Sequence, residues 1–111
     1  MVVSLGDDEK DDNGISGTYT VASNYPGFVN GQVYWIQNNE NNNAIWYRND
    51  RVIIGTKKDV GNGIYDNVTW LLSSRWLSNF DEDNPTWPYE VKEWEDISNS
   101  KKVNLNIHVA G

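Results

Sequence analysis

Apolar and polar residues alternate over short stretches along most of this chain, a pattern typical of half-buried β-strands. The clearest example is KVNLNIHV at residues 102–109, where four aliphatic side chains are expected inward and the asparagines and histidine outward. Further short strands are expected at residues 17–22, 64–72 and 87–94. Because apolar residues also recur at helical spacing after residue 64, a short helical turn is a second expectation near residues 73–77.

A three-stranded meander is predicted at residues 32–56. Its strands are expected at 32–37, 44–48 and 51–56. The first connection is the asparagine-rich NNENNN at 38–43, and the second is the two-residue turn Asn49-Asp50, whose residue types tolerate left-handed backbone. Two further turn signals precede the meander, Tyr25-Pro26-Gly27 and Asn30-Gly31.

Symmetric pairing divides the side chains of the meander between two faces. Trp35 falls opposite Trp46 across the first connection, and Trp46 falls opposite Ile53 across the second. One face is apolar or phenolic and is assigned to the core: Tyr34, Ile36, Ile45, Tyr47, Val52 and Ile54. The mixed face carries Val33, Trp35, Trp46 and Ile53, with Gln37, Arg48 and Arg51 at its edges. A one-residue change in register would exchange the faces of a strand.

These strands and turns predict an all-β fold, a single small antiparallel β-sandwich or barrel of about seven to eight short strands. The length of 111 residues suits one domain with one core. Six Trp and six Tyr supply large buried areas, since each ring covers about 150–250 Å². Residues 7–14, DDEKDDNG, contain no apolar side chain, so residues 1–14 are expected to be an acidic flexible tail and residues 15–111 the β domain.

The charge balance restricts the partners of the domain. A net charge of −7 at pH 7 repels nucleic acid, and no cluster of basic residues offsets it, so no nucleic-acid partner is expected. No stretch approaches the roughly 20 apolar residues of a membrane span, so none is expected. Cations, including calcium, fit the charge, whereas the oligomeric state is not specified by the sequence.

The residues that could carry catalysis do not indicate an enzyme. Cysteine is absent, which excludes thiolate chemistry and cysteine-bound zinc. The single histidine, His108, lies on the predicted polar face of the last strand. No nucleophile elbow, P-loop or dinucleotide motif is present. The carboxylates at residues 90–96 are expected on an exposed strand face and its turn, not as a paired acid and base.

Two acidic loops match the preference of calcium for several oxygen ligands. The first contains Asp59, Asn62 and Asp66, and the second contains Asp81 and Asp83. Neither loop has the EF-hand spacing, which requires a glutamate at position 12. A structural calcium ion is the one candidate cofactor, and solvated acidic loops are the alternative.

The aromatic residues of the mixed face are candidates for sugar binding. Sugars stack their C–H faces on aromatic rings, while polar side chains hydrogen-bond the hydroxyl groups. The predicted ligand site therefore consists of Trp35, Trp46, Gln37, Arg48, Arg51, Asn41 and Asn42. In the alternative interpretation both tryptophans belong to the core.

A series of short motifs also carries a resemblance. In chain order they are Gly17-Thr-Tyr19, Val29-Asn30-Gly31-Gln-Val-Tyr34, Ile45-Trp46-Tyr47, Val52-Ile-Ile54-Gly55, Pro85, Trp87-Pro-Tyr89, Trp94 and Leu105-Asn-Ile107-His-Val109. Over residues 15–109 this order resembles a short repeat-type module found, often within multidomain chains, in marine invertebrates and protists. The chain departs from that pattern at Val52, where a Trp is expected, and in the longer and more apolar WLLSSRWLSNF. The resemblance implies a single β domain, an extracellular setting and no catalysis, and it supplies no ligand.

The sequence thus predicts a non-enzymatic binding module of a secreted or extracellular protein, whose ligand is a carbohydrate or glycoconjugate. The alternative is a structural or matrix-adhesion domain in which the acidic loops bind calcium or mineral and the aromatic residues form the core. The expected partner is accordingly a glycan or an extracellular protein.

Overall fold

The computed structural model describes residues 1–22, 28–48, 50–75, 77, 81, 83 and 85–109. Its regular structure is almost entirely strand, arranged as one antiparallel sheet of nine strands and a separate two-stranded hairpin. The strands of the sheet are β1 Val2–Leu5, β2 Gly17–Val21, β5 Trp35–Gln37, β6 Asn43–Arg48, β7 Arg51–Thr56, β8 Leu71–Ser74, β9 Trp94–Asp96, β10 Lys101–Val103 and β11 Leu105–His108. The hairpin is β3 Phe28–Val29 with β4 Gln32–Val33, and two short 3-10 helices are η1 Lys57–Asp59 and η2 Pro88–Glu90.

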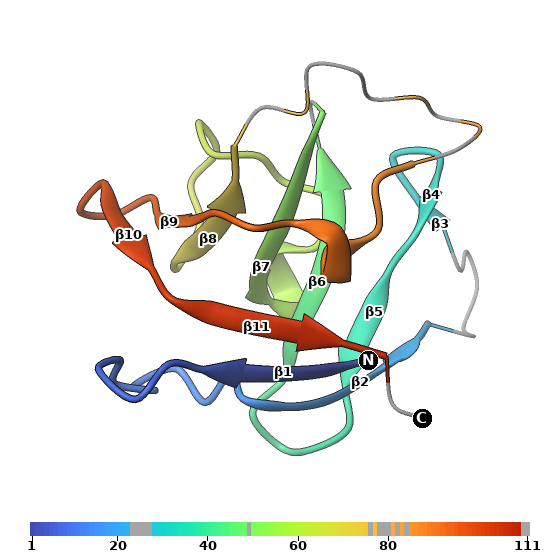
Figure 1. Ribbon diagram of the computed structural model, residues 1–111. Coiled ribbons are helices and arrows are strands. Elements are labelled where there is room, and N and C mark those ends of the chain that lie inside the picture. The colour runs from blue at the N-terminus through green and yellow to red at the C-terminus, as the bar shows by residue number, and fades with distance from the viewer. Residues whose placement is uncertain are drawn as a thin grey trace.

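The sheet curls into a nearly closed barrel (Figure 1). Its order is β10-β9-β8-β7-β6-β5-β2-β1-β11, and the two edge strands follow one another in the chain with only Asn104 between them. Because β10 pairs with β9 and β11 pairs with β1, residues 101–108 bridge the two ends of the sheet. The predicted all-β fold, an antiparallel sandwich or barrel, is confirmed.

Two tight turns have the predicted chemistry. The β6–β7 hairpin places Trp46 opposite Ile53, as expected, and Asp50 of its turn has a φ of 61°. Between β3 and β4, Asn30 and Gly31 have φ values of 55° and 79°. Positive φ at both central residues is what a type I′ hairpin turn requires, which explains the Asn-Gly pair.

The register between β5 and β6 differs from the prediction by one residue. Trp35 pairs with Ile45 instead of Trp46. The reason is that β6 begins at Asn43, so the connection spans 38–42 and is one residue shorter than expected. Each side chain of β5 therefore lies on the face opposite to the predicted one. Trp35 belongs to the barrel interior, whereas Tyr34 packs against the outer face.

Two apolar clusters cover the two faces of the sheet. The inner cluster fills the barrel and consists of Val3, Ile15, Tyr19, Trp35, Ile45, Tyr47, Val52, Ile54, Leu72, Trp94 and Ile107. The outer cluster consists of Ala44, Trp46, Ile53 and Leu71. Val60, Ile64 and Val68, from the loop after η1, pack onto the outer cluster. These residues cover a sheet face instead of forming the strand predicted at 64–72, and β8 begins only at Leu71.

The N-terminal segment differs from the predicted flexible tail. Val2–Leu5 forms β1, which lies between β2 and β11 in the sheet. The acidic residues that follow form the loop from β1 to β2. In this loop the carboxylate of Asp11 accepts hydrogen bonds from the amides of Ile15 and Ser16, at 2.7 and 3.0 Å. The fold thus uses residues that lie before the expected domain start at residue 15.

Other predicted elements also change. The segment 87–94 contains η2 and not a strand, because Pro88 begins the helix where no N–H donor is needed. The helical turn expected near 73–77 overlaps β8, which ends at Ser74. Val109, one of the four aliphatic side chains expected inward in the last strand, is 61% exposed. The predicted turn at residues 25–27 lies outside the described residues.

Candidate functional site

The two tryptophans of the predicted ligand face are buried on opposite faces of the sheet. Trp35 is 5% exposed and packs in the barrel, with its ring centroid 6.1 Å from those of both Tyr47 and Trp87. Trp46 is fully buried in the outer cluster, and its indole N–H donates to the carbonyl of Asn62 at 2.9 Å. Neither ring can stack on a ligand, so the predicted Trp35–Trp46 face is wrong.

The amide residues of the predicted site hold the neighbouring β1–β2 loop. Gln37 is 4% exposed, and its Nε2 donates to the carbonyls of Gly14 and Ser16 at 2.7 and 3.1 Å. Asn41 Nδ2 also donates to the carbonyl of Gly14, at 3.1 Å. Asn41 and Asn42 border a shallow, open hollow beside η1, away from the two tryptophans. These residues therefore serve the fold or line a separate surface.

The first predicted calcium loop uses its polar groups within the protein. Asp59 Oδ2 accepts hydrogen bonds from the Thr56 hydroxyl at 2.7 Å and from the Thr69 amide at 3.0 Å. The carbonyl of Asn62 accepts the Trp46 indole, and Asp66 accepts the amide of Gly63. The three predicted ligands of this loop thus anchor a turn.

The second predicted calcium loop is described only at Asp81 and Asp83. The Oδ1 of Asp81 accepts the amide of Asp83 at 3.0 Å, and both residues are exposed. Within the described ranges, no three His, Asp or Glu side chains are grouped so that they could hold a metal ion.

The carboxylate of Asp59 is the most constrained acid of these loops. Its residue is 7% exposed, and burial alone would raise its pKa. The hydrogen bonds from Thr56 and Thr69 and the charge of Lys58 outweigh burial and hold the pKa of Asp59 below its ordinary value. Asp59 is therefore a charged structural acid that fixes the start of the loop after η1.

Two other residues of the predicted site do come together, in a different place. A pocket of about 350 Å³ lies on the outer face at the turn end of the β6–β7 hairpin. We refer to it as the arginine–tyrosine pocket, and it is lined by Arg48, Asp50, Arg51, Ile53, Gly63, Ile64 and Tyr65. Arg48 and Arg51 are opposite one another in the ladder, which places both guanidinium groups on one side of the hairpin.

The loop that completes this pocket is fixed by several hydrogen bonds. The carbonyl of Gly61 accepts from Arg48 Nη1 at 3.3 Å and from Asn30 Nδ2 at 3.2 Å. The indole N–H of Trp46 donates to the carbonyl of the next residue, Asn62. Tyr65 follows in this loop, and its side chain is 92% exposed. An aromatic ring thus stands in solvent at the rim of the pocket on a well-anchored loop.

The chemistry of the pocket is that of recognition through hydrogen bonds and stacking. A guanidinium offers up to five N–H donors in a planar fork, and a carboxylate offers acceptors only. Arg48 Nε is buried and has no hydrogen-bond partner among the described residues. Arg51 and Asp50 add a second set of donors and one set of acceptors. The ring of Tyr65 adds an apolar face and a phenolic hydroxyl.

The sequence interpretation included Arg48 and Arg51 but missed Tyr65. The strand predicted at residues 64–72 includes Tyr65, and in such a strand a tyrosine has no special meaning. The turn-forming residues on both sides of Ile64 and Tyr65 were the available signal, because an aromatic residue in a turn is seldom core.

No protein-family model, curated protein or solved structure matches the chain. The resemblance to the repeat-type module accordingly stays a prediction. In the described part of the chain, no helix is both long enough and apolar enough to cross a membrane.

Proposed function

We propose that this domain is a non-enzymatic binding module that binds carbohydrate in the arginine–tyrosine pocket. The observation that carries the proposal is the 92% exposed ring of Tyr65 at the rim of a pocket with two arginines. Large aromatic side chains normally contribute to the core or to interfaces, so a ring left in water on an anchored loop needs a reason. Stacking against the C–H face of a pyranose supplies one.

The polar groups of the pocket suit a sugar held against that ring. Arg48 and Arg51 donate hydrogen bonds, and the carboxylate of Asp50 accepts them, so all three can bind the hydroxyl groups of a sugar. A volume of about 350 Å³ lies in the usual range of small-ligand sites, roughly 300–1,000 Å³. A pocket of this size suits one or two sugar rings, whereas a long polysaccharide would need an extended groove.

The local charge also favours the proposal. The chain has a net charge of −7, but the pocket wall carries two arginines against Asp50. Neutral sugars, or sugars with one carboxylate, fit this balance. The secreted or extracellular setting implied by the resemblance is part of the same proposal, since glycans and glycoconjugates are abundant there.

A glycan array followed by calorimetric titration of the best hit tests this proposal. Tyr65→Ala and Arg51→Ala should each lower the affinity about tenfold or more, a change of about 1.4 kcal/mol. The melting temperature of Tyr65→Ala should stay close to that of the wild type, because substitutions at exposed positions rarely change stability by more than about 0.5 kcal/mol. Tyr89→Ala and Arg75→Ala are matched controls at exposed positions outside the pocket and should bind normally.

The proposal fails if the wild-type protein binds no glycan on the array. It also fails if the two control substitutions lower the affinity for the glycan as much as Tyr65→Ala and Arg51→Ala do. Tyr65→Phe refines the result, because it keeps the ring and should retain most of the affinity if stacking dominates.

The alternative function, a structural or matrix-adhesion domain, is favoured by one observation, the burial of Trp35 and Trp46 in the core. Its calcium component has a direct test. If the acidic loops bind calcium, millimolar calcium should raise the melting temperature and EDTA should lower it. If neither calcium nor EDTA changes the melting temperature, the loops do not bind a structural calcium ion, and the carbohydrate proposal is unaffected.

A further inference from the structure

The bent strand that closes the barrel leaves part of one edge without a partner. In an antiparallel ladder, a residue directs its N–H and C=O to one neighbour, and the next residue directs them to the other. The amide of Gly6 donates to the carbonyl of Asn104 at 2.8 Å. By this alternation, the backbone groups of Asn106 and His108 also point toward β1. The N–H and C=O groups of Leu105 and Ile107 therefore face away from β1.

That second side of β11 has no strand beside it. Of residues 101–108, β9 pairs only with 101–103, and the chain before β9 leads back into η2 instead of continuing along β11. Outside the strand ladders, no backbone hydrogen bond of the described residues involves Leu105 or Ile107. Ile107 is 5% exposed, whereas Leu105 is only partly buried and lines a groove. The barrel wall is thus open beside Leu105, between β11 and the segment at Lys92 and Glu93.

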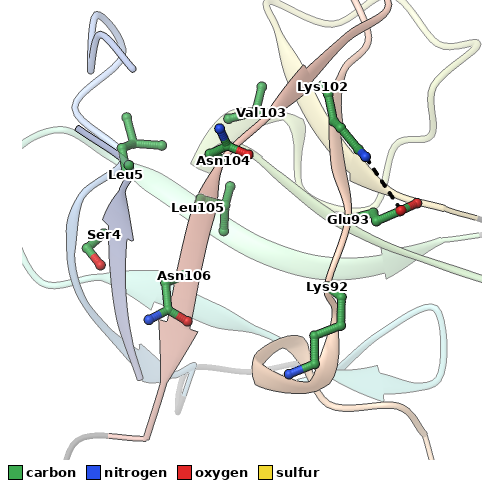
Figure 2. A pocket seen from close by; sticks show the side chains of 10 residues that line it. Ser4, Leu5, Lys92, Glu93, Lys102, Val103, Asn104, Leu105 and Asn106 are labelled. Atoms are coloured by element: carbon green, nitrogen blue, oxygen red, sulfur yellow. Dashed lines mark ion pairs between the residues drawn. The ribbon is translucent and has the colours of Figure 1, made fainter. Parts of the chain in front are cut away.

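A groove of about 460 Å³ occupies this opening (Figure 2). Figure 2 shows β1 and β11 on one side, and Lys92, Glu93 and Lys102 on the other. Leu5, Val103 and Leu105 belong to the apolar residues packed against the inner cluster, so they form an apolar floor. Polar side chains of Ser4, Asn104 and Asn106 form the rim on the β1–β11 side.

The far wall of the groove has an excess of positive charge. Glu93 is shared by two cations, Arg75 at 2.7 Å and Lys102 at 3.6 Å. Lys92 makes no ion pair with any described residue, and it lines the same groove. Two lysines, Lys92 and Lys102, therefore accompany one carboxylate in the groove lining, and Arg75 binds that carboxylate from outside the lining. On the other side, Glu9 accepts the amide of Asn104 at 3.3 Å.

We propose that this groove binds an extended peptide segment of a partner protein, which adds as a short strand along β11. The segment alternates apolar and acidic side chains. Its backbone pairs with the N–H and C=O of Leu105, its apolar side chains lie on Leu105 and Val103, and its acidic side chains reach Lys92. Addition of a strand to an open sheet edge is a common mode of peptide recognition, and the charge of the wall selects an acidic sequence.

The size of the opening supports a short segment. The groove is lined on this side by Val103, Asn104, Leu105 and Asn106, and a strand rises about 3.3 Å per residue, so three to four peptide residues match this stretch. Natural edge strands are usually blocked by proline, by inward-pointing charge or by a covering loop. The stretch from Val103 to Asn106 contains no proline and no charged side chain, and η2 lies near β11.

The test uses the full chain and three synthetic pentapeptides. The first is acetylated Glu-Val-Glu-Val-Glu amide; the second has lysine in place of each glutamate; the third is the first with alternate backbone nitrogens methylated. Titration followed by NMR should give saturable shifts of the amides from Val103 to Asn106 with the first peptide, the largest at Leu105. The lysine and N-methyl peptides should bind at least tenfold more weakly.

A protein variant completes the design. Lys92→Glu should weaken the acidic peptide at least tenfold and strengthen the lysine peptide, while Lys101→Glu, a charge reversal at an exposed position outside the groove lining, should change neither by more than about twofold. Tyr65→Ala should bind the peptide normally, which separates this site from the proposed sugar site. Equal binding of the N-methyl peptide would overturn strand addition. Concentration-dependent self-association that shifts the same amides would show that a second copy of the chain occupies the edge.

Discussion

The indole N–H of Trp46 donates a hydrogen bond to the backbone carbonyl of Asn62 at 2.9 Å. This bond joins the sheet to the loop that carries Tyr65, from the fully buried outer cluster. Asn62 lies three residues before Tyr65, so the position of the pocket rim depends on a residue that no ligand can touch. Trp46 is a positioning residue for the arginine–tyrosine pocket.

Trp46→Phe should destabilise the domain by about 2 kcal/mol or more, because it leaves a partly buried carbonyl unpaired and a gap in the outer cluster. Trp94→Phe is the matched control, since Trp94 is 2% exposed and its indole N–H has no partner among the described residues. Urea denaturation should show the larger loss for Trp46→Phe. Hydrogen exchange should become faster at residues 61–66 in that variant only, and equal behaviour of the two variants would contradict the anchoring role.

Gly55 of the Ile-Ile-Gly motif is required by close packing. A Cβ atom at this position would lie 2.7 Å from Leu71 Cδ2 and 2.8 Å from Trp46 Cη2. Gly55→Ala should therefore cost about 1–3 kcal/mol through overpacking. Leu71→Ala is expected to reduce this cost in the double variant, since it removes one of the two clashing groups. A cost that is unchanged in the Leu71→Ala background, measured by urea denaturation, would argue against the steric explanation.

Asp59 should make the stability of the domain sensitive to acid. Its pKa is lowered in the folded protein relative to the unfolded chain, so its contribution is complete above the unfolded value of about 3.9 and is lost as pH falls through the folded value. Asp59→Asn should lower the free energy of unfolding at pH 7 by about 1–3 kcal/mol. Below pH about 4 the variant and the wild type should converge. Parallel curves across the acid range would contradict the lowered pKa.

Tyr19 and Tyr47 should govern the alkaline limit of stability. Burial raises the pKa of both phenols far above the ordinary value, with further contributions from Asp11 at Tyr19 and from Glu90 at Tyr47. Their hydroxyls donate to the carbonyls of Ile15 and Thr86, each at 2.8 Å. Their stabilising effect is therefore present below the unfolded pKa of about 10 and is lost at higher pH.

Urea denaturation at several alkaline pH values measures this loss. The free energy of unfolding should fall above pH about 10, and the fall should be shallower in Tyr47→Phe, which removes one of the two titrating phenols. Tyr65→Phe, at a tyrosine that is 92% exposed, is the control and should leave the slope unchanged. A wild-type stability that stays constant above pH 10 would contradict the raised pKa values.

The parts of the fold that short turns determine were predictable from the sequence. Asn49-Asp50 leaves no freedom in loop length, so the β6–β7 register followed directly. The asparagine-rich connection before β6 offers no such constraint, because any of its residues can end or begin a strand. Asn43 begins β6 with its side chain 1% exposed and bound to the carbonyls of Asn13 and Gly14, but its neighbours in the sequence are also asparagines.

The candidate site was only half predictable for a related reason. Arg48 and Arg51 follow from the hairpin register alone, since both are fixed by the same short turn. Tyr65 lies near them because of a loop whose path depends on hydrogen bonds made by Trp46, Asp59 and Gly61. Each of these bonds joins residues that are ten or more positions apart in the sequence, so the local pattern does not indicate them. The strand β1 was not predictable because four residues next to an acidic run carry too little pattern, and its two partners, β2 and β11, both lie beyond that run in the sequence.

The pairing of Val2 with His108 has a consequence for how the chain folds during synthesis. Within this domain, β1 is synthesised early and gains its second neighbour, β11, only after residues 105–108 follow, and β9 waits for β10 in the same segment. Contacts of such large sequence separation slow folding. Nascent chains that stop short of residue 101 should therefore hold an open sheet with unpaired edges at β1 and β9, and cooperative folding should appear only when residues 101–108 have emerged.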